Sequence, residues 1–281
     1  APSSNSGNNI FVYYLFRTVA TVDHPSTSAL SATSGTFTTD LTVDTDTLKV
    51  DSTNDRVGIN TTAMSSYYAK DFVVSCANQG GMTLVGGTSD TQYLMFADGT
   101  SSADRYRGFI EYSHSTNKMS LAADGVGRVV INPAGEVTMP NQPAFLSGTS
   151  RVTTITGDGT TYSATAATWT DIYDQNADFS NGTFTAPVTG KYNFTFLLTL
   201  AGTATNHTNS TFTFVVSNRN TTYYNSPGVD RNTSLGGTSY VLTTNVDMDA
   251  NDTAHLSIHV AGGDKTVMLY ELSRFSGYLV C

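Results

Sequence analysis

Apolar and polar residues alternate along much of this chain, most clearly between Phe184 and Phe196 (FTAPVTGKYNFTF). In that stretch Tyr192, Phe194 and Phe196 are separated by single polar residues. Because successive side chains of a strand point to opposite faces, this spacing predicts a strand with one buried aromatic face and one polar face in water. Gly190 precedes the strand, where a tight turn would use a residue that is free to adopt positive φ.

The rest of the sequence shows no window with a sustained apolar stripe at helical spacing. Thr, Ser, Asn and Gly fill most of the polar positions, only 13% of the residues are charged, and the chain contains 15 Tyr and 14 Phe. Uncharged sequences that are rich in Thr and aromatic residues favour strands over helices. We therefore expect an all-β protein with almost no helix.

Two segments in the first half of the chain share one pattern. They are LKVDSTNDRVGIN, which begins at Leu48, and VVINPAGEVTM, which begins at Val129. Each predicts a short strand, a turn rich in Asn, Asp, Pro and Gly, and a second short strand. Such a hairpin has no second apolar surface with which to close a core, and it is marginally stable alone. Intertwining with other chains would supply that surface.

These patterns divide the chain into three parts. Residues 1–40 contain a polar run (APSSNSGNN) and one apolar segment, Ile10 to Phe16, that predicts a strand, and we interpret them as an N-terminal attachment segment. Residues 41–142 contain both hairpins and are interpreted as β-rich shaft repeats. Residues 143–281 contain the alternating aromatic strand and are interpreted as a separate head domain.

Three segments of the last part resemble the globular head of complement component 1, subunit q, a trimeric jelly roll that shares its shape with the tumour-necrosis-factor family. They are PAF at 143–145, FTAPVTGKYNF at 184–194 and FSGYL at 275–279. The resemblance implies a C-terminal jelly-roll head of the ten-stranded type, a homotrimer, and a function in display and binding rather than in chemistry. The residues that form this structural signature are Phe184, Gly190, Tyr192, Phe194, Phe196, Phe275 and Gly277.

Residues 41–139 resemble the shaft repeats of bacteriophage tail fibres and spikes. The matching strings are DSTNDRVGINTT and a hairpin rich in Tyr and Phe, RGFIEYSHSTNKMSLAADG. In those proteins similar strings precede a C-terminal receptor-binding head, so the resemblance implies a trimeric fibre with an intertwined β shaft. We interpret Arg105, Arg107, Glu111 and His114 of this region as solvated or inter-chain pairs.

The two resemblances together imply a virion structural protein, namely a homotrimeric tail fibre or spike that mediates adsorption to the host-cell surface. Its partners would be other virion proteins, bound through the N-terminal segment, and a host surface glycan or protein. It would be made in the host cytoplasm and displayed on the particle surface. The alternatives are a capsid or neck decoration fibre, a polysaccharide depolymerase spike, and a secreted complement-like lectin.

The charge balance argues against two classes of partner. The formal net charge is −9 and the sequence pI is about 4.8, whereas binding to nucleic acid phosphates or to anionic lipid requires a basic surface. No apolar stretch is long enough to span a membrane. We therefore expect no nucleic acid partner and no membrane insertion. Cys76 and Cys281 are far apart in sequence, and we expect both to be free thiols.

No set of residues in the sequence has the spacing of a catalytic centre, so we expect no enzyme, no catalytic residues and no cofactor. A GxSxG motif is absent, and so is a phosphate-binding Gly loop followed by Lys. Glu111 and Glu136 are candidates for paired carboxylates only because Glu is scarce in this chain.

Two patterns were considered as metal sites, and neither is complete. His255 and His259 share one face of a predicted strand, and three copies on a trimer axis could gather a metal, but no Cys or carboxylate completes the set. The acidic turns around Asp44 to Asp55 and Asp247 to Asp252 lack the regular calcium-binding loop. Asp and Asn also favour ordinary turns, so we expect no metal.

The strongest binding candidate is the segment from Asn218 to Gly236, NRNTTYYNSPGVDRNTSLG, which we predict to be a loop between two strands. Its Tyr, Asn, Ser, Gly and Arg residues are typical of binding loops. The alternative is an ordinary connection whose tyrosines pack on a neighbouring chain. Trp169, the single Trp, is interpreted as core or inter-chain packing rather than as a sugar platform. The receptor-binding candidates are Tyr223, Tyr224, Arg219, Arg231 and Asn225.

Overall fold

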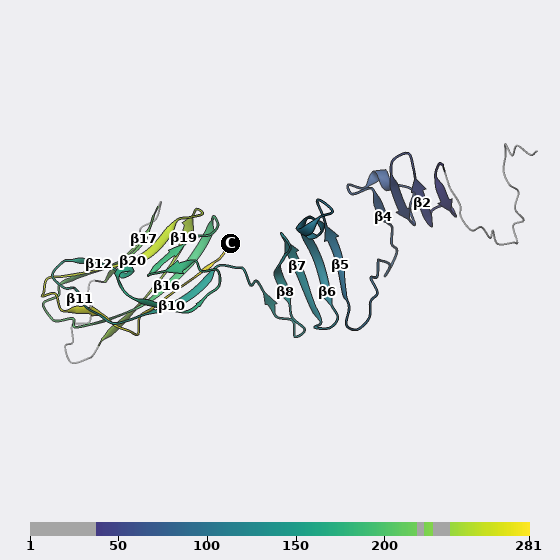
Figure 1. Ribbon diagram of the computed structural model, residues 1–281. Coiled ribbons are helices and arrows are strands. Elements are labelled where there is room, and N and C mark those ends of the chain that lie inside the picture. Colours follow the sequence, from purple (N-terminus) through teal and green to yellow (C-terminus); the bar gives the residue numbers. More distant parts are fainter. Residues whose placement is uncertain (1–37, 218–221, 227–236) are drawn as a thin grey trace, which may run out of the picture. The chain divides into compact units, whose positions relative to one another are not determined.

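The computed structural model describes residues 38–217, 222–226 and 237–281, with the backbone alone for 222–226. Strands dominate it, and its described residues contain no α-helix, only the short 3-10 segments η1 (Met64–Ser66), η2 (Ser102–Tyr106) and η3 (Ala164–Ala166). The expected all-β fold is confirmed (Figure 1). The strand expected at Ile10 to Phe16 lies outside the described residues, as does most of the expected attachment segment.

The chain forms two compact units, Ala1–Thr83 and Leu84–Cys281. The division into attachment segment, shaft and head therefore stays a prediction. The described part of the first unit contains a four-stranded sheet of order β1-β2-β3-β4, in which only β3 and β4 are parallel. Its strands are β1 (Leu41–Val43), β2 (Leu48–Asp51), β3 (Arg56–Ile59) and β4 (Phe72–Val74).

The second unit begins with a five-stranded antiparallel sheet of order β5-β6-β7-β8-β9, whose strands lie side by side in one layer (Figure 1). Both predicted hairpins are confirmed, because Val50 of β2 lies opposite Val57 of β3, and Ile131 of β8 lies opposite Val137 of β9. The strands of this sheet are β5 (Thr91–Phe96), β6 (Gly108–Ser113), β7 (Lys118–Ala123), β8 (Val126–Ile131) and β9 (Val137–Thr138).

A two-layered sandwich follows the five-stranded sheet. Sheet 1 has the order β13-β10-β22-β16-β19, and sheet 2 has the order β14-β15-β20-β17-β18. The strands of sheet 1 are β10 (Ala144–Thr149), β13 (Trp169–Asp174), β16 (Gly190–Ala201), β19 (Thr238–Met248) and β22 (Arg274–Leu279). Those of sheet 2 are β14 (Phe179–Ser180), β15 (Thr183–Thr185), β17 (Asn209–Val216), β18 (Thr222–Ser226) and β20 (Thr253–Ala261).

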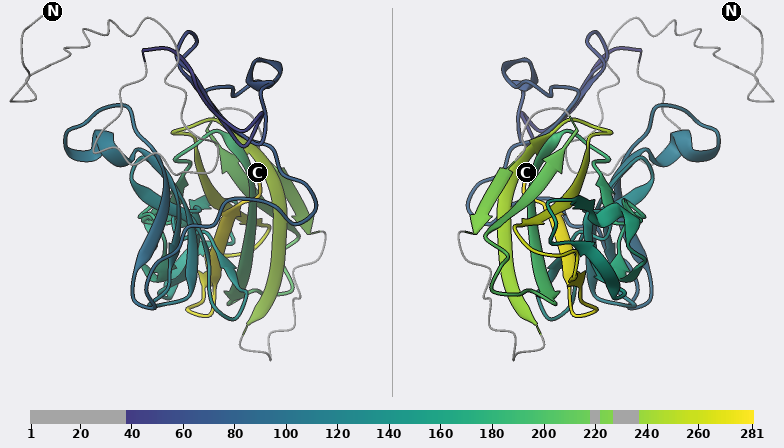
Figure 2. Two further views of the ribbon diagram at one scale, coloured as in Figure 1. Left: turned by 90° about the vertical axis from the view of Figure 1, so that its right-hand side faces the viewer. Right: turned by 90° about the vertical axis from the view of Figure 1, so that its left-hand side faces the viewer.

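The connections between the two sheets make the sandwich a jelly roll. The chain crosses from one sheet to the other between β16 and β17, between β18 and β19, and again on either side of β20. Figure 2 shows the long strands of the sandwich, coloured green to yellow, from two sides. Three short strands, β11 (Val152–Thr156), β12 (Thr161–Ser163) and β21 (Val267–Leu269), extend the ten-stranded arrangement that was expected.

The core of the sandwich is an aromatic cluster between the two sheets. The ring centroid of Phe275 lies 5.1 Å from that of Phe145, 5.3 Å from that of Phe196 and 5.8 Å from that of Phe194. All four side chains are buried, and burial alternates along β16 as the sequence period predicted. Burial of several aromatic side chains in contact with one another supplies the main stabilisation of this domain.

Trp169 belongs to the same core. Its ring lies edge-on to the ring of Phe179 at 5.6 Å, and its Nε1–H donates to the carbonyl oxygen of Ala164 at 2.8 Å. The hydrogen bond satisfies the one polar group of a ring that is otherwise packed against apolar side chains. The interpretation of Trp169 as a packing residue is confirmed.

Two glycines of the structural signature are required by crowding rather than by backbone conformation. A Cβ at Gly277 would lie 2.5 Å from Cδ1 of Phe194 and 2.7 Å from Cε1 of Phe145. At Gly190 a Cβ would lie 2.7 Å from the carbonyl oxygen of Cys281, to which the neighbouring Lys191 N–H donates. The expectation of positive φ at Gly190 is wrong, because this residue begins β16 and is absent from the set of glycines with positive φ.

We predict that Gly277→Ala destabilises the sandwich by about 1–3 kcal/mol, because a buried methyl group must displace two packed rings. The measurement is the urea dependence of Trp169 fluorescence, since this is the only Trp and its ring lies 6.3 Å from Phe275. Ser276→Ala, on the opposite face of β22, is the control. An equal stability of the two variants would contradict the packing argument.

Candidate functional site

The end of the sandwich at which β16 finishes carries a group of connections, and we call it the tip. There β16 ends at Ala201, β20 ends at Ala261 opposite Asn209 of β17, and β19 begins at Thr238 opposite Leu200. The opposite end, where Gly190 lies beside the backbone of Cys281, is the base. Connecting segments on a rigid scaffold are where binding residues concentrate, so the tip is the candidate functional site.

His207 joins three of the tip connections. Its side chain is fully buried, its Nδ1 accepts from the backbone N–H of Ala204 at 2.7 Å, and its Nε2 lies 3.0 Å from the carbonyl oxygen of Asp264. One nitrogen therefore accepts and the other donates, which is the pattern of a neutral imidazole. A Cβ at Gly263 would lie 2.6 Å from Cδ2 of His207, and a Cβ at Gly157 would lie 2.8 Å from Nε2.

This arrangement fixes the conformation of the tip. The segments that follow β11, β16 and β20 all contact one imidazole ring, and two of them bear glycines that leave space for it. The role of His207 could not be predicted from the sequence, because its partner Asp264 is 57 residues away and no local motif links the two.

A polar group lies beside the tip at the ends of β10 and β22. Nε and Nη2 of Arg151 donate to the two carboxylate oxygens of Glu271 at 2.7 and 2.9 Å, and the guanidinium lies 4.3 Å from the ring centroid of Tyr270. The hydrogen bonds from Arg151 lower the pKa of Glu271 below its ordinary value. This pair, whose members are 120 residues apart, was also missed from the sequence.

Next to that pair, a shallow depression is lined by both polar and apolar side chains. Nη1 of Arg274 donates to the carbonyl oxygens of Glu271 and Ser273, so part of its guanidinium is already engaged. The lining residues are Gly148, Thr149, Ser150, Thr170, Ile172, Glu271 and Arg274. Hydroxyl groups, a carboxylate and a guanidinium are groups that hydrogen-bond sugars or polar peptides.

The predicted binding loop from Asn218 to Gly236 is not a single loop. Residues 222–226 form β18, which runs antiparallel to β17, with Thr222 opposite Phe214 and Ser226 opposite Ser210. β18 therefore begins toward the base and ends toward the tip.

Tyr223, Tyr224 and Asn225 lie in β18, where only the backbone is described, and Arg219 and Arg231 lie outside the described residues. The role of all five in receptor binding stays a prediction.

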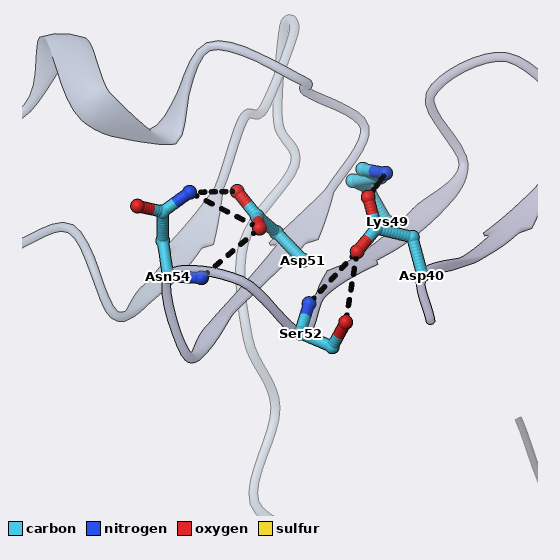
Figure 3. A network of polar contacts seen from close by, with 5 residues as sticks. All are labelled: Asp40, Lys49, Asp51, Ser52 and Asn54. Carbon is cyan, nitrogen blue, oxygen red and sulfur yellow. Dashed lines mark hydrogen bonds and ion pairs between the residues drawn. The ribbon is translucent and has the colours of Figure 1, made fainter. Parts of the chain in front are cut away.

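In the first acidic turn, Asp51 and the nearby Asp40 accept internal hydrogen bonds (Figure 3). Asp40 accepts from the side chain of Lys49 and from Ser52, and Asp51 accepts from the backbone and the side chain of Asn54. Asp44 and Asp55 have φ near +55°, a conformation that Asp adopts in turns.

The second acidic turn is closed in the same way. Oδ2 of the buried Asp252 accepts from the backbone N–H of Asp249 at 2.7 Å, and its Oδ1 accepts from the hydroxyl of Ser217 at 2.9 Å. The described residues contain no group of three or more His, Cys, Asp or Glu that could hold a metal ion.

His255 and His259 lie on the face of β20 that points away from the core, on one side as expected. His259 Nδ1 is 3.3 Å from the hydroxyl of Thr161, and burial lowers the pKa of His255.

Arg107, at the end of the five-stranded sheet, pairs within the chain with Asp98, Asp104 and Asp124 at 2.6–3.3 Å. Cys76 and Cys281 are exposed and free. Among the described residues, no helix has the length and apolarity of a membrane span.

Comparison with known proteins finds similarity of structure only. Neither a protein-family model nor a curated protein matches the chain. The globular domain of zebrafish complement 1qA is 17% identical over 50% of this chain and 98% of its own length, with a TM-score of 0.35. Rabbit GITRL is 10% identical over 49% of this chain and 94% of its own length, with a TM-score of 0.30. The Eiger TNF from S. frugiperda is 14% identical over 50% of this chain and 94% of its own length, with a TM-score of 0.34. The jelly-roll assignment rests on the strand order of the two sheets.

We predict that His207→Phe loosens the tip while the core of the sandwich stays folded. The ring is retained, but the Ala204 N–H loses its acceptor in a buried site, at a cost of about 2 kcal/mol. Amide hydrogen exchange should accelerate in residues 202–208 and 262–266 and stay unchanged in the centre of β16. The exposed substitution Thr205→Ala is the control, and unchanged exchange in both variants would refute the role of His207.

The lowered pKa of His255 predicts a loss of stability in mild acid. The unfolded chain, with an ordinary His pKa near 6.5, binds the proton before the folded protein does. The free energy of unfolding must therefore fall as the pH drops below about 6.5. We expect His255→Gln to lose less stability than the unmodified protein between pH 7.5 and 5.5 in urea titrations. His259→Gln is the control on the same strand face, and an identical pH dependence in all three proteins would contradict the prediction.

Proposed function

We propose that this protein is a homotrimeric tail fibre or spike of a bacteriophage, which binds the host-cell surface through its jelly-roll head. The observation that carries the proposal is a contrast within the chain. The sandwich has a complete aromatic core of its own, whereas the hydrophobic residues from Leu84 to Gln142 include none that is buried. A domain with a core of its own, preceded by a sheet without one, is the arrangement expected of a display head on an assembled stem.

The outer face of sheet 1 supports the homotrimer. Val241 is 69% exposed and Tyr278 is 51% exposed on this face, and Tyr173 of the edge strand β13, which lies opposite Leu146, is 49% exposed. Between them lie partly buried Leu and uncharged Thr, Ser and Asn residues of β10, β16 and β22, and Arg274 is a charged residue at the tip end of this face, opposite Leu197. An exposed apolar face of this kind is typical of a surface that another chain covers.

Binding would take place at the tip, at the side chains beside it and along β18, which includes Tyr223 and Tyr224. Three identical heads on one particle give avidity for a repeated surface glycan or protein, so a weak single site is sufficient. The Arg151–Glu271 pair, the ring of Tyr270 and the adjacent depression supply groups suited to such a ligand. Under this proposal the protein is displayed on the virion, and its N-terminal segment binds other virion proteins.

The test is adsorption of fluorescently labelled protein to a panel of bacterial strains that differ in their surface glycans. We expect binding to some strains, loss of binding when the surface glycan or protein receptor is removed, and protection of those strains from infection. Absence of binding to every strain, together with binding to animal cell surfaces, would replace this proposal by the complement-like lectin. Release of reducing sugar from capsular polysaccharide would replace it by the depolymerase spike.

For the predicted binding residues, we expect Tyr223→Ala combined with Tyr224→Ala to weaken adsorption at least tenfold while the native mass stays that of the unmodified protein. The reason is that Tyr supplies much of the contact area in binding surfaces. Tyr67→Ala combined with Tyr68→Ala, a pair of exposed tyrosines in the first unit, is the matched control. Unchanged adsorption by the Tyr223 and Tyr224 variant would remove these residues from the binding site.

A further inference from the structure

The two faces of the five-stranded sheet differ in composition, and the pairing of the strands assigns each residue to its face. Residues directly opposite each other on neighbouring strands project from the same face. Leu94, Ile110, Leu121 and Val129 are paired in this way across β5, β6, β7 and β8. A second row pairs Tyr112, Met119, Ile131 and Val137 across β6 to β9.

We call the side of the sheet that carries these two rows the apolar face. Phe96 of β5 projects from it as well, since it lies two residues beyond Leu94. Nowhere in its paired rows does a charged residue occur. The opposite face is mixed, because Glu111 and Lys118 lie there together with the apolar residues Tyr93, Met95, Phe109 and Val130.

Most of the apolar face is uncovered in a single chain, although Leu84 lies beside Leu94 and Ile110 at one margin, where Gln92 continues the second row opposite Tyr112. Leu94, Ile110 and Leu121 are 46%, 40% and 43% exposed, although β6 and β7, which carry the last two, have a neighbouring strand on each side. Phe96 and Val137 are each 58% exposed. An open sheet that buries none of its large apolar side chains does not gain enough to offset the conformational entropy of ordering its strands. The face must therefore be covered when the sheet is folded.

The features of the face point to further copies of the same chain as its cover. The need for a cover arises in every copy, and other copies are present wherever the protein is made. The face offers no charge with which to select a different partner, and the outer face of sheet 1, with Val241 and Tyr278, has the same unmet need in the same chain. In an assembly with closed rotational symmetry, both faces of every copy are covered by other copies.

We propose that the apolar face of β5–β9 packs against the same face of two other copies, so that three sheets share one core and fold only on association. This inference rests on the proposed homotrimer and adds which side of the sheet faces the partners. Glu111 and Lys118 then remain in water on the outside. Assembly and folding of this segment become a single step, whereas the sandwich folds around its own core.

The test places one charge on either face at neighbouring positions of β7. Leu121→Lys lies at the centre of the apolar face, and Ser120→Lys, its matched control, lies beside it on the opposite face. The readouts are amide hydrogen exchange in β6 and β7, native mass by light scattering, and Trp169 fluorescence, which reports the folding of the sandwich independently. A third variant, Leu121→Met, keeps the volume and the apolar character.

We expect Leu121→Lys to accelerate exchange in β6 and β7 on the order of a hundredfold, because a charge cannot be buried at the shared core. Ser120→Lys and Leu121→Met should exchange as the unmodified protein does, and Trp169 fluorescence should be unchanged in all three. Equal protection in Leu121→Lys and Ser120→Lys would overturn the proposal, and so would a loss of protection confined to Ser120→Lys.

The outcomes separate this inference from the proposed function. If Leu121→Lys behaves as expected and the unmodified protein binds no bacterial strain, the assignment of the apolar face stands and adsorption fails. If the unmodified protein binds cells as a trimer while Leu121→Lys leaves β6 and β7 protected, adsorption stands and the assignment of the face fails. A monomeric unmodified protein overturns both the homotrimer and the shared core.

Discussion

Apolar side chains leave water only where one layer of structure faces another, and within the described residues the chain builds two facing sheets from Ala144 onward. In the sandwich, sheets 1 and 2 enclose Phe145, Phe194 and Phe275. The packing of these rings restricts which residues the neighbouring positions can hold. Gly277 has no room for a side chain because two of these rings occupy the space. In the five-stranded sheet that precedes the sandwich no large apolar side chain is buried, and we propose that association with further copies buries them.

Within the sandwich, the rigid core is separate from the tip, which we propose to bind the host-cell surface. The core fixes the strand ends, and His207 then joins the connections that follow β11, β16 and β20 into one unit at the tip. Arg151 and Glu271 are held at the margin of the tip by their bidentate contact, although exposed ion pairs of this kind add little to stability. A preorganised set of polar groups loses less entropy when it binds, and repetition in three copies multiplies a weak contact.

Much of the fold followed from local sequence patterns, whereas the tip did not. The period of two at Tyr192, Phe194 and Phe196 predicted the strand and its buried face, and the paired hairpins were predicted by their turns. The conformation of Gly190 was mistaken because crowding against Cys281 cannot be inferred from nearby residues. The sequence predicts a loop where β18 lies, because Asn, Thr and Ser surround its tyrosines. The His207 and Arg151 contacts join residues that are distant in sequence, and which face of β5–β9 is apolar depends on strand register.

Whether the five-stranded sheet folds only with its partners can be decided by the native mass of the unmodified protein in solution, determined by light scattering over a hundredfold range of concentration. The account predicts a single species with three times the 29.9 kDa chain mass at every concentration, because the five-stranded sheet cannot stay folded without its partners. A monomer of 29.9 kDa in which β6 and β7 are nonetheless protected from hydrogen exchange would contradict it.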